Sequence, residues 1–226
     1  MPSGWTRQQC AGVELTQHAE AKAWTWLSAT HPALAVHMAR FERALRARGD
    51  KGEFWWELRP CAYYGVLEAP KIVYPDIAKS PRFHLDELGC FISNTAWCIG
   101  NGDPYLLAVL NSRLAWFLIS SISIPFGTRA GQYRYRLFYQ YMEQLPIFWP
   151  EAWSESQTAV RGSLVVLANE MQRLESSLAA ADSPHERLLI QRERDSASRR
   201  IDRLVYDLYG LTDDEIALVE SSFEGA

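Results

Sequence analysis

The densest group of side chains able to hold a charged ligand lies in residues 126–136, FGTRAGQYRYR. Eight consecutive residues of this segment include three arginines, one glutamine and two tyrosines, and the segment has no acidic residue. In a strand that starts at Gln132, the glutamine and the last two arginines share one face, because successive side chains alternate. Arginine can form paired hydrogen bonds with a guanine edge or a phosphate, and glutamine with an adenine edge. The segment therefore predicts a DNA-facing surface that includes Arg129, Gln132, Tyr133, Arg134 and Arg136, although an edge strand with a solvent-exposed polar face would have the same pattern.

Two further places are candidates for DNA contacts. Arg59 follows Trp55 and Trp56, and Lys71 lies between tyrosines in the sequence. A cation beside aromatic rings could hold a phosphate, whereas the large area of the tryptophans suits a hydrophobic core. The turn at Asn94 and Thr95 joins two short apolar runs and completes the set of predicted DNA contacts.

The charge balance limits which partners are plausible. The chain has 226 residues, is 48% hydrophobic and 22% charged, and has a net charge of −4. A protein that binds a polyanion through bulk charge is therefore disfavoured. Residues 1–150 have 15 basic and 12 acidic residues (+3), whereas residues 151–226 have 8 and 15 (−7). A surface that touches an anion is expected in the first of these segments.

The elements that must position these side chains can be read from apolar spacing and from turn residues. Apolar residues at 4-3-4 spacing after Pro32 predict a helix that ends at Gly49. The middle of the chain predicts strands at 71–74, 89–93 and 96–99, a helix from Pro104, and a β segment over 127–137. Three capping boxes, at Ser154, Ser183 and Thr212, predict helix starts in the last third.

Together these signals predict an α+β fold. It has N-terminal helices, a small mixed β-sheet core with a buried helix, and a C-terminal antiparallel helical hairpin that resembles a coiled coil. Residues 1–150 are predicted to form a domain with an N-terminal helical lead-in, and this domain includes the DNA-facing surface. Residues 151–226 are predicted to form the hairpin, a spacer or docking element.

The sequence lacks the common catalytic motifs. It has no GxxxxGK phosphate loop, no HExxH motif and no Asn-Pro-Pro-aromatic tetrapeptide, and its histidines and cysteines lack metal-ligand spacing. No catalytic residue and no metal site are therefore predicted. The glycine turn Gly100–Asp103 follows an apolar run and precedes a helix, so a nucleotide-cofactor loop is an alternative there, although its third glycine is missing.

The cysteines and the first fifteen residues predict the cell compartment. The four cysteines are scattered without CxxC spacing, and residues 1–15 contain no apolar run, so reduced cysteines in a cytoplasmic protein without a signal peptide are expected. Residues 105–126 are apolar enough to imitate a membrane span. Arg113 at their centre makes a buried core helix the better prediction, and no membrane partner is expected.

Five runs of the sequence resemble a known family in their order. They are residues 50–59 (DKGEFWWELR), 70–77 (PKIVYPDI), 105–114 (YLLAVLNSRL), 141–147 (YMEQLPI) and 201–212 (IDRLVYDLYGLT). In this order they resemble the TaqI-like C-terminal specificity domain of adenine-specific DNA methyltransferases and of Eco57I-type restriction–modification enzymes. The resemblance covers about residues 30–220. Phe148 and Trp149 depart from the family, in which a second proline is common after the LPI run.

The resemblance implies that residues 1–150 are a DNA target-recognition domain, which holds duplex DNA and reads a short sequence. A separate methyltransferase domain or subunit would modify adenine N6, possess the Asn-Pro-Pro-aromatic site and bind S-adenosylmethionine, and the parent system would be a type II restriction–modification enzyme. The partners implied are double-stranded DNA and this methyltransferase or endonuclease domain, with no cofactor in the chain itself. The residue patterns leave two other readings open: a small enzyme that uses a nucleotide or S-adenosylmethionine, and an interaction scaffold whose helical hairpin never meets DNA.

Overall fold

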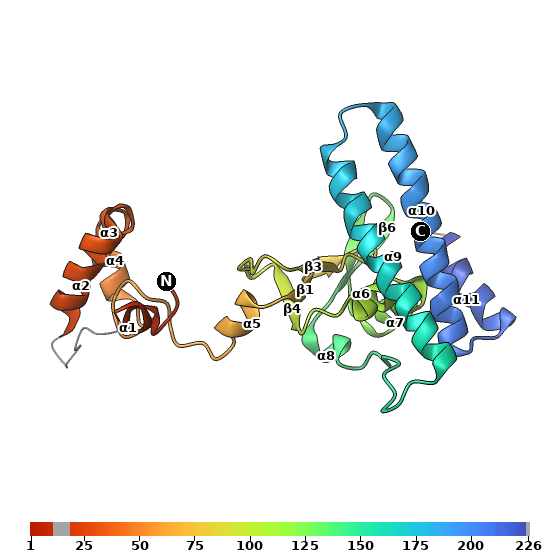
Figure 1. The fold of residues 1–226 in the computed structure, drawn as a ribbon, viewed down its shortest axis with the longest axis horizontal. Coiled ribbons are helices and arrows are strands. Elements are labelled where there is room, and N and C mark those ends of the chain that lie inside the picture. The colour runs from red at the N-terminus through yellow and green to blue at the C-terminus, as the bar shows by residue number, and fades with distance from the viewer. Residues whose placement is uncertain (11–18, 225–226) are drawn as a thin grey trace. The chain divides into compact units, whose positions relative to one another are not determined.

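The computed structural model describes residues 1–10 and 19–224, and residues 11–18 of the predicted N-terminal helical lead-in lie outside these ranges. The chain divides into two compact units, residues 1–65 and 66–226. The first unit contains α1 (Trp5–Gln9), α2 (Ala19–Thr30), α3 (Pro32–Ala39) and α4 (Glu42–Ala47), and α5 (Tyr64–Glu68) lies at the division (Figure 1).

Tryptophans form the core of the first unit. Trp55 and Trp56 are buried, and the Trp24 ring packs against both. The Trp56 indole donates a hydrogen bond to the Thr6 hydroxyl at 3.0 Å. Beside it the buried Glu57 carboxylate accepts the Thr6 amide at 3.0 Å. The aromatic run therefore supplies packing area, as its large rings favour.

The predicted continuous helix after Pro32 is broken in the structure. α3 ends at Ala39 and α4 begins at Glu42. The Arg40 amide bonds to the carbonyl of His37, three residues earlier, so the last turn of α3 is tightened. Phe41, a member of the predicted apolar face, is 49% exposed, so this face is interrupted where the helix breaks.

The second unit contains two small antiparallel sheets in place of one mixed sheet. The first has the order β3 (His84–Asp86), β1 (Lys71–Pro75), β4 (Ala96–Gly100). The second has the order β2 (Ile77–Ala78), β6 (Gln132–Arg136), β5 (Pro125–Arg129). β1 and β2 are consecutive, so the chain leaves one sheet and enters the other at Asp76.

The predicted strand at 89–93 is wrong, because the chain turns around a carboxylate there. Asp86 accepts hydrogen bonds from the amides of Leu88 (3.0 Å) and Cys90 (2.8 Å). Gly89 between them has a φ of 70°, and a Cβ atom on it would lie 2.8 Å from the Glu68 carbonyl oxygen. A regular strand cannot follow this path.

The apolar segment after Asp103 forms two helices, α6 (Pro104–Leu110) and α7 (Arg113–Ile122). Asp103 caps α6 as predicted, accepting the Tyr105 amide at 2.7 Å. Ser112 caps α7, and the two helices bend by 62° at the break. Among the described residues, no single helix is long and apolar enough to cross a membrane; the bent pair would be by length and composition alone, and most of its side chains are buried.

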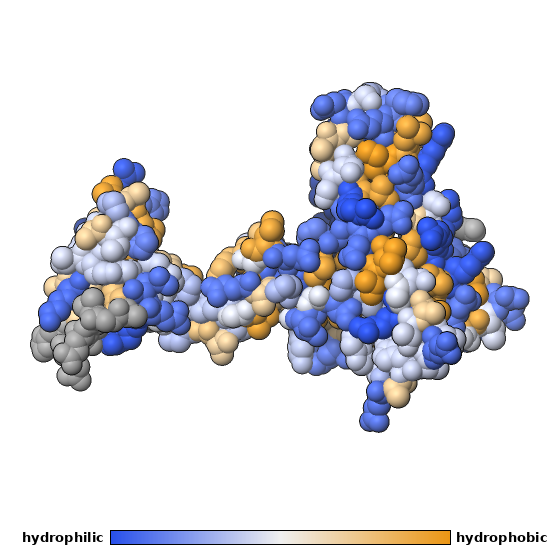
Figure 2. Space-filling model, viewed as in Figure 1, coloured by the Kyte–Doolittle hydropathy of each residue, from blue (hydrophilic) through white to orange (hydrophobic). Residues whose placement is uncertain are grey.

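The last third forms α9 (Glu155–Ala180), α10 (Pro184–Tyr209) and α11 (Asp213–Glu224), with α8 (Tyr139–Met142) before them. α9 and α10 are 26 residues each and run side by side in opposite directions (Figure 1). Apolar side chains lie between them, with hydrophilic ones at the edges (Figure 2). The Ser154 capping box is formed, and Gly210 ends α10 at a φ of 67° with the Leu211 amide bonded to the Tyr206 carbonyl. The α+β class with a C-terminal helical hairpin is confirmed.

The half of the α9–α10 hairpin that contains Leu164 and Ile201 shares a core with the sheets. Leu164, Leu167 and Ile201 are buried together with Ile72 of β1 and Leu107 of α6. The predicted functional division at residue 150 stays a prediction.

Candidate nucleic-acid interface

The arginine-rich segment forms the β5–β6 hairpin. Its turn is Ala130–Gly131, with φ values of 54° and 79°. Positive φ at both central residues is the mark of a type I′ turn, whose twist suits a two-residue hairpin loop. Arg129 and Gln132 are paired across this turn. All five residues of β5 are exposed, so the hairpin presents a two-stranded ribbon to solvent.

A bulge in β5 turns one aromatic ring toward the arginines. Phe126 and Gly127 lie between the pairs Pro125–Tyr135 and Thr128–Tyr133, where β6 has Arg134 alone. The Phe126 ring centroid is 4.3 Å from the Arg136 guanidinium carbon and 5.4 Å from that of Arg134. Since both arginines contact one ring, they share a face of β6, as alternation predicts.

The opposite face of β6 points into the protein. Tyr135 packs on Trp116 of α7 with ring centroids 6.0 Å apart, and Leu137 is fully buried. Tyr133 departs from this pattern, because it is 60% exposed near the turn. The sheet thus fixes the arginine face outward by burying its other side.

Asp76 joins the hairpin to the first sheet. One carboxylate oxygen accepts the Trp97 indole N–H at 3.1 Å, and the other lies 3.3 Å from Arg136. The Asp76 amide donates to the Thr95 carbonyl, and its own carbonyl accepts the Leu137 amide, both at 2.9 Å. The corner between β1 and β2 therefore brings the 94–95 turn and β6 together.

The side chains at this corner that were predicted to contact DNA differ in their exposure and in their partners within the protein. Asn94, Thr95, Arg129 and Tyr133 are exposed, and Gln132 is partly exposed. Arg136 has an ion pair and lies near two rings, Phe126 and Phe138. Arg134 has no hydrogen-bonding partner among the described residues, and its Nε is buried without one.

The prediction for Lys71 must be corrected. Its side chain is fully buried, where it forms an ion pair with Asp86 and donates to the Leu67 carbonyl at 2.6 Å. An ammonium group enclosed in this way cannot reach a phosphate. The Lys71 bond, aided by the amides of Leu88 and Cys90, lowers the pKa of the Asp86 carboxyl.

Arg59 lies in the first unit, whereas the hairpin belongs to the second. Its side chain is 64% exposed, with its nearest acidic partner, Asp50, at 3.8 Å. An exposed pair at this distance contributes little to stability, so the guanidinium remains accessible.

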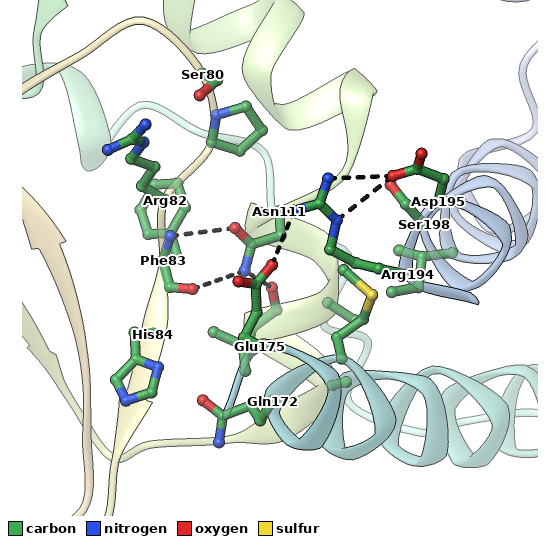
Figure 3. A pocket seen from close by; sticks show the side chains of 16 residues that line it. Ser80, Arg82, Phe83, His84, Asn111, Gln172, Glu175, Arg194, Asp195 and Ser198 are labelled. Atoms are coloured by element: carbon green, nitrogen blue, oxygen red, sulfur yellow. Dashed lines mark hydrogen bonds and ion pairs between the residues drawn. The ribbon is translucent and has the colours of Figure 1, made fainter. Parts of the chain in front are cut away.

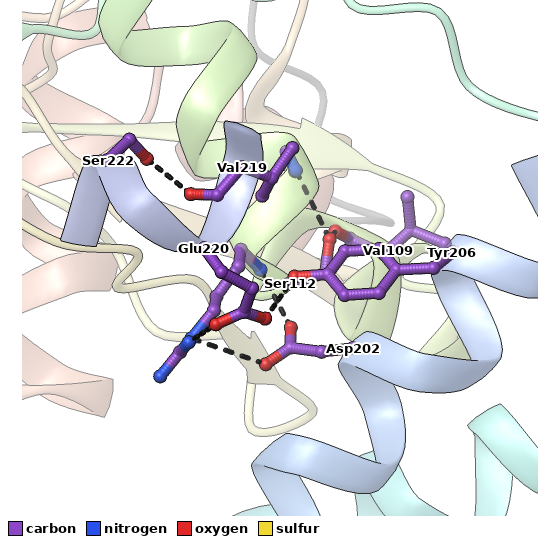
Figure 4. A network of polar contacts seen from close by, with 9 residues as sticks. Val109, Ser112, Asp202, Tyr206, Val219, Glu220 and Ser222 are labelled. Carbon is purple, nitrogen blue, oxygen red and sulfur yellow. Dashed lines mark hydrogen bonds and ion pairs between the residues drawn. The ribbon is translucent and has the colours of Figure 1, made fainter. Parts of the chain in front are cut away.

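A second polar centre holds the last helix. Arg113 pairs with Glu220 of α11, and its amide donates to the Asp202 carboxylate at 2.8 Å (Figure 4). Tyr206 donates to Glu220 at 2.7 Å. Burial raises the pKa of Asp202, although the Arg113 amide and charge act in the opposite direction. Since these groups satisfy one another, we assign this centre to packing between α7, α10 and α11.

A cavity between residues 80–84, α6 and the α9–α10 hairpin has a volume of about 640 Å³. Figure 3 shows the side chains that line it. Several of the polar side chains that line it are hydrogen-bonded or ion-paired within the protein. Asn111 bonds to the amide and carbonyl of Phe83, and Arg194 pairs with Glu175 and Asp195. Gln172 accepts the Leu85 amide at 3.0 Å and so covers the edge strand β3. This side of the hairpin braces the first sheet.

The glycine turn considered as a cofactor loop is used for packing. A Cβ atom on Gly102 would lie 2.4 Å from a Leu85 methyl and 2.9 Å from the Lys71 amide nitrogen. Asp103 caps α6 and also pairs with Arg161 at 2.9 Å. These residues do not form an open cradle for a nucleotide. Among the described residues, no group of three or more histidines, cysteines or acids could hold a metal ion.

Three residues of the corner were not predicted as site residues. Phe126 stands inside the arginine-rich segment, so its position next to the arginines was a usable signal. Asp76 reads as an ordinary turn residue in the sequence, and Trp97 as part of an apolar strand. Their roles depend on contacts across 60 and 21 residues, which local patterns do not reveal.

The comparisons with known proteins identify the class. Residues 37–147, just under half of the chain, match the family model of the TaqI-like C-terminal specificity domain. The matched segment includes the hairpin, Asp76 and the 94–95 turn. The sequence is also 31% identical over 87 residues to the type II methyltransferase M.BanIII of Aneurinibacillus aneurinilyticus. That similarity covers 37% of this chain and 15% of the methyltransferase, so the chain spans a small part of this relative.

Proposed function

We propose that this chain is a sequence-specific duplex-DNA recognition module of a DNA-methyltransferase system. The observation that carries the proposal is the exposed β5–β6 hairpin, whose arginine face lies within the specificity-domain match. A two-stranded ribbon of this kind fits the major groove, and arginine is the side chain best suited to phosphate and guanine. Arg129 and the 94–95 turn would make further contacts beside it.

The chemistry of methyl transfer would come from a partner. Adenine N6 must leave the base stack before it can react, and this chain would hold the surrounding duplex while that happens. A catalytic domain or subunit would supply S-adenosylmethionine and the residues that act on the base. The adenine specificity and the restriction–modification context come from the family resemblance and are part of the proposal.

The first test measures binding of the full chain to short duplexes by fluorescence anisotropy over a range of salt. Each phosphate contact contributes about −0.9 to the slope of log affinity against log salt. We expect the affinity of the wild-type chain to fall with rising salt, and the double variant Arg134→Ala/Arg136→Ala to weaken binding at least tenfold at each salt concentration. The matched control is Arg199→Ala/Arg200→Ala, which removes two exposed arginines of α10.

These measurements distinguish a DNA-recognition module from an interaction scaffold that does not bind DNA. If the control weakens binding as much as the hairpin variant does, the interface is assigned to the wrong surface. If the wild-type chain binds no duplex at low salt, the scaffold reading is preferred and the proposed function is wrong.

A further inference from the structure

The two arginines on the hairpin face are held in different ways. Arg136 is fixed by the Asp76 carboxylate at 3.3 Å and lies 4.3 and 5.2 Å from the Phe126 and Phe138 ring centroids. Asp76 is itself fixed by Trp97 and by two main-chain hydrogen bonds. The ion pair and the two rings orient this guanidinium and offset its charge, which favours a supporting role over a ligand contact.

The Arg134 guanidinium lies near an aromatic ring but has no hydrogen-bond acceptor among the described residues. Its stem lies on β6 opposite the Phe126–Gly127 bulge, and its guanidinium carbon is 5.4 Å from the Phe126 ring centroid. The buried Nε shows that this edge of the guanidinium faces the protein. The terminal nitrogens have no acceptor among the described residues, so a pair of donors is available to a ligand.

The geometry favours a base edge over a phosphate for this pair of donors. Arg134 lies within a ribbon whose outer strand is wholly exposed, whereas Arg129 lies beside the turn. When such a ribbon enters the major groove, a side chain in its middle faces the bases. Two parallel donors match O6 and N7 of guanine, the commonest specific contact of arginine.

We propose that Arg134 is a specificity-determining residue that reads a guanine in the recognised sequence, and that Asp76 is a positioning residue acting through Arg136. This inference rests on the proposed function, because it assigns the chemistry read at the same surface. Phe126 supplies the platform on which both guanidinium groups rest.

The experiment is selection of random duplexes by the full wild-type chain and by Arg134→Lys, with Arg200→Lys on α10 as the matched control. Lysine retains the charge but lacks the two-pronged donor geometry. We expect the wild-type chain and the control to prefer guanine at one common position. Arg134→Lys should lower that preference by roughly tenfold or more, the scale of one lost bidentate contact.

Asp76→Asn tests the positioning role, because asparagine can still accept the Trp97 hydrogen bond but cannot neutralise Arg136. We expect a weaker guanine preference together with tighter binding to random duplex. The salt slope should steepen by about 0.9, because the released Arg136 can meet a phosphate. A merely structural role would lower the melting temperature and weaken binding to all duplexes alike.

The outcomes distinguish this inference from the function on which it rests. An unchanged guanine preference in Arg134→Lys overturns the reading role, and a uniform loss of binding in Asp76→Asn overturns the positioning role. If the wild-type chain binds duplexes without any base preference, this inference fails while the DNA-binding function stands. If the wild-type chain binds none, both fail.

Discussion

At the scale of single residues, Lys71 shows how the same residue type can serve packing or binding. It lies between Tyr64 and Tyr74 in the sequence, yet the structure buries it completely against Asp86. A buried charge is tolerated when it is paired and hydrogen-bonded, and removing one partner leaves the other uncompensated. Asp86 also receives two loop amides, so this pair organises the turn that replaces the expected strand.

This pair makes stability depend on pH in the acid range. The pKa of Asp86 lies below its ordinary value of 3.8 in the folded chain, so its contribution is present above pH 3.8 and is lost as the pH falls below that value. We expect Asp86→Asn to lower the free energy of unfolding at neutral pH by about 3–5 kcal/mol, because Lys71 is left buried and unpaired. Urea denaturation at several pH values would measure both effects.

The control for that experiment is the double variant Lys71→Met/Asp86→Asn. It removes the stranded charge as well, so it should recover much of the stability that Asp86→Asn loses. Both variants should also lose stability less steeply than the wild type between pH 4 and pH 2, about the range in which a paired aspartate titrates. Equal acid sensitivity of all three proteins would contradict the assignment.

At the scale of elements, the hairpin turn has a residue that fits its backbone poorly. Ala130 has a φ of 54°, a left-handed conformation that costs a non-glycine residue about 1–2 kcal/mol. Asparagine tolerates this conformation, and Asn-Gly is the preferred pair in a type I′ turn. Ala130→Asn should therefore raise the free energy of unfolding by about 0.5–1 kcal/mol.

Ala130→Val is the contrasting variant, because a β-branched residue is strained at positive φ. It should destabilise the protein in the same urea titration. A type I′ turn is ruled out if valine and asparagine at this position have the same effect on stability.

The elements with local signals could be predicted from the sequence. Asp103 and Pro104 mark the start of α6, three serine or threonine caps mark the C-terminal helices, and the hairpin has its glycine turn. The break between α6 and α7 has one such local signal, the Ser112 cap, but it lies inside a continuous apolar run that also suits a single helix. There the Arg113 amide, an unpaired donor of a helix start, is satisfied by Asp202, 89 residues away.

The candidate site also combines features that the local sequence predicts with features that depend on tertiary contacts. The exposed arginine face follows from strand alternation alone, which is a local property. The role of Asp76 depends on a contact with Arg136 across 60 residues, and the burial of Lys71 depends on the pairing of β1 with β3. Side-chain type and spacing therefore identified the surface, but only tertiary structure separated supported arginines from free ones.

At the scale of the whole molecule, the net charge of −4 is the sum of two segments with opposite net charge. Residues 1–150 sum to +3 and contain the proposed DNA surface, and residues 151–226 sum to −7. The acidic part is joined to the sheets by a shared core, so its charge is carried on a rigid support within the second unit. Most of the acidic excess lies in α11, since residues 213–224 have five acids and no basic residue, whereas α9 and α10 together have eight acidic and eight basic residues. An acidic surface repels phosphate, so DNA contacts are favoured on the β5–β6 hairpin over α11.

The chain as a whole is expected to bind no S-adenosylmethionine by itself. The glycine turn is filled by Leu85 and Lys71, and the specificity-domain match ends at residue 147 without a nucleotide-binding glycine motif inside it. We therefore expect isothermal titration of the purified chain with S-adenosylmethionine to give no binding heat. Duplex binding by the same sample, measured by anisotropy, shows that the protein is folded and active. Saturable heat with one site per chain would instead favour the small-enzyme reading, and a Gly102→Ala variant would then show whether the turn is responsible.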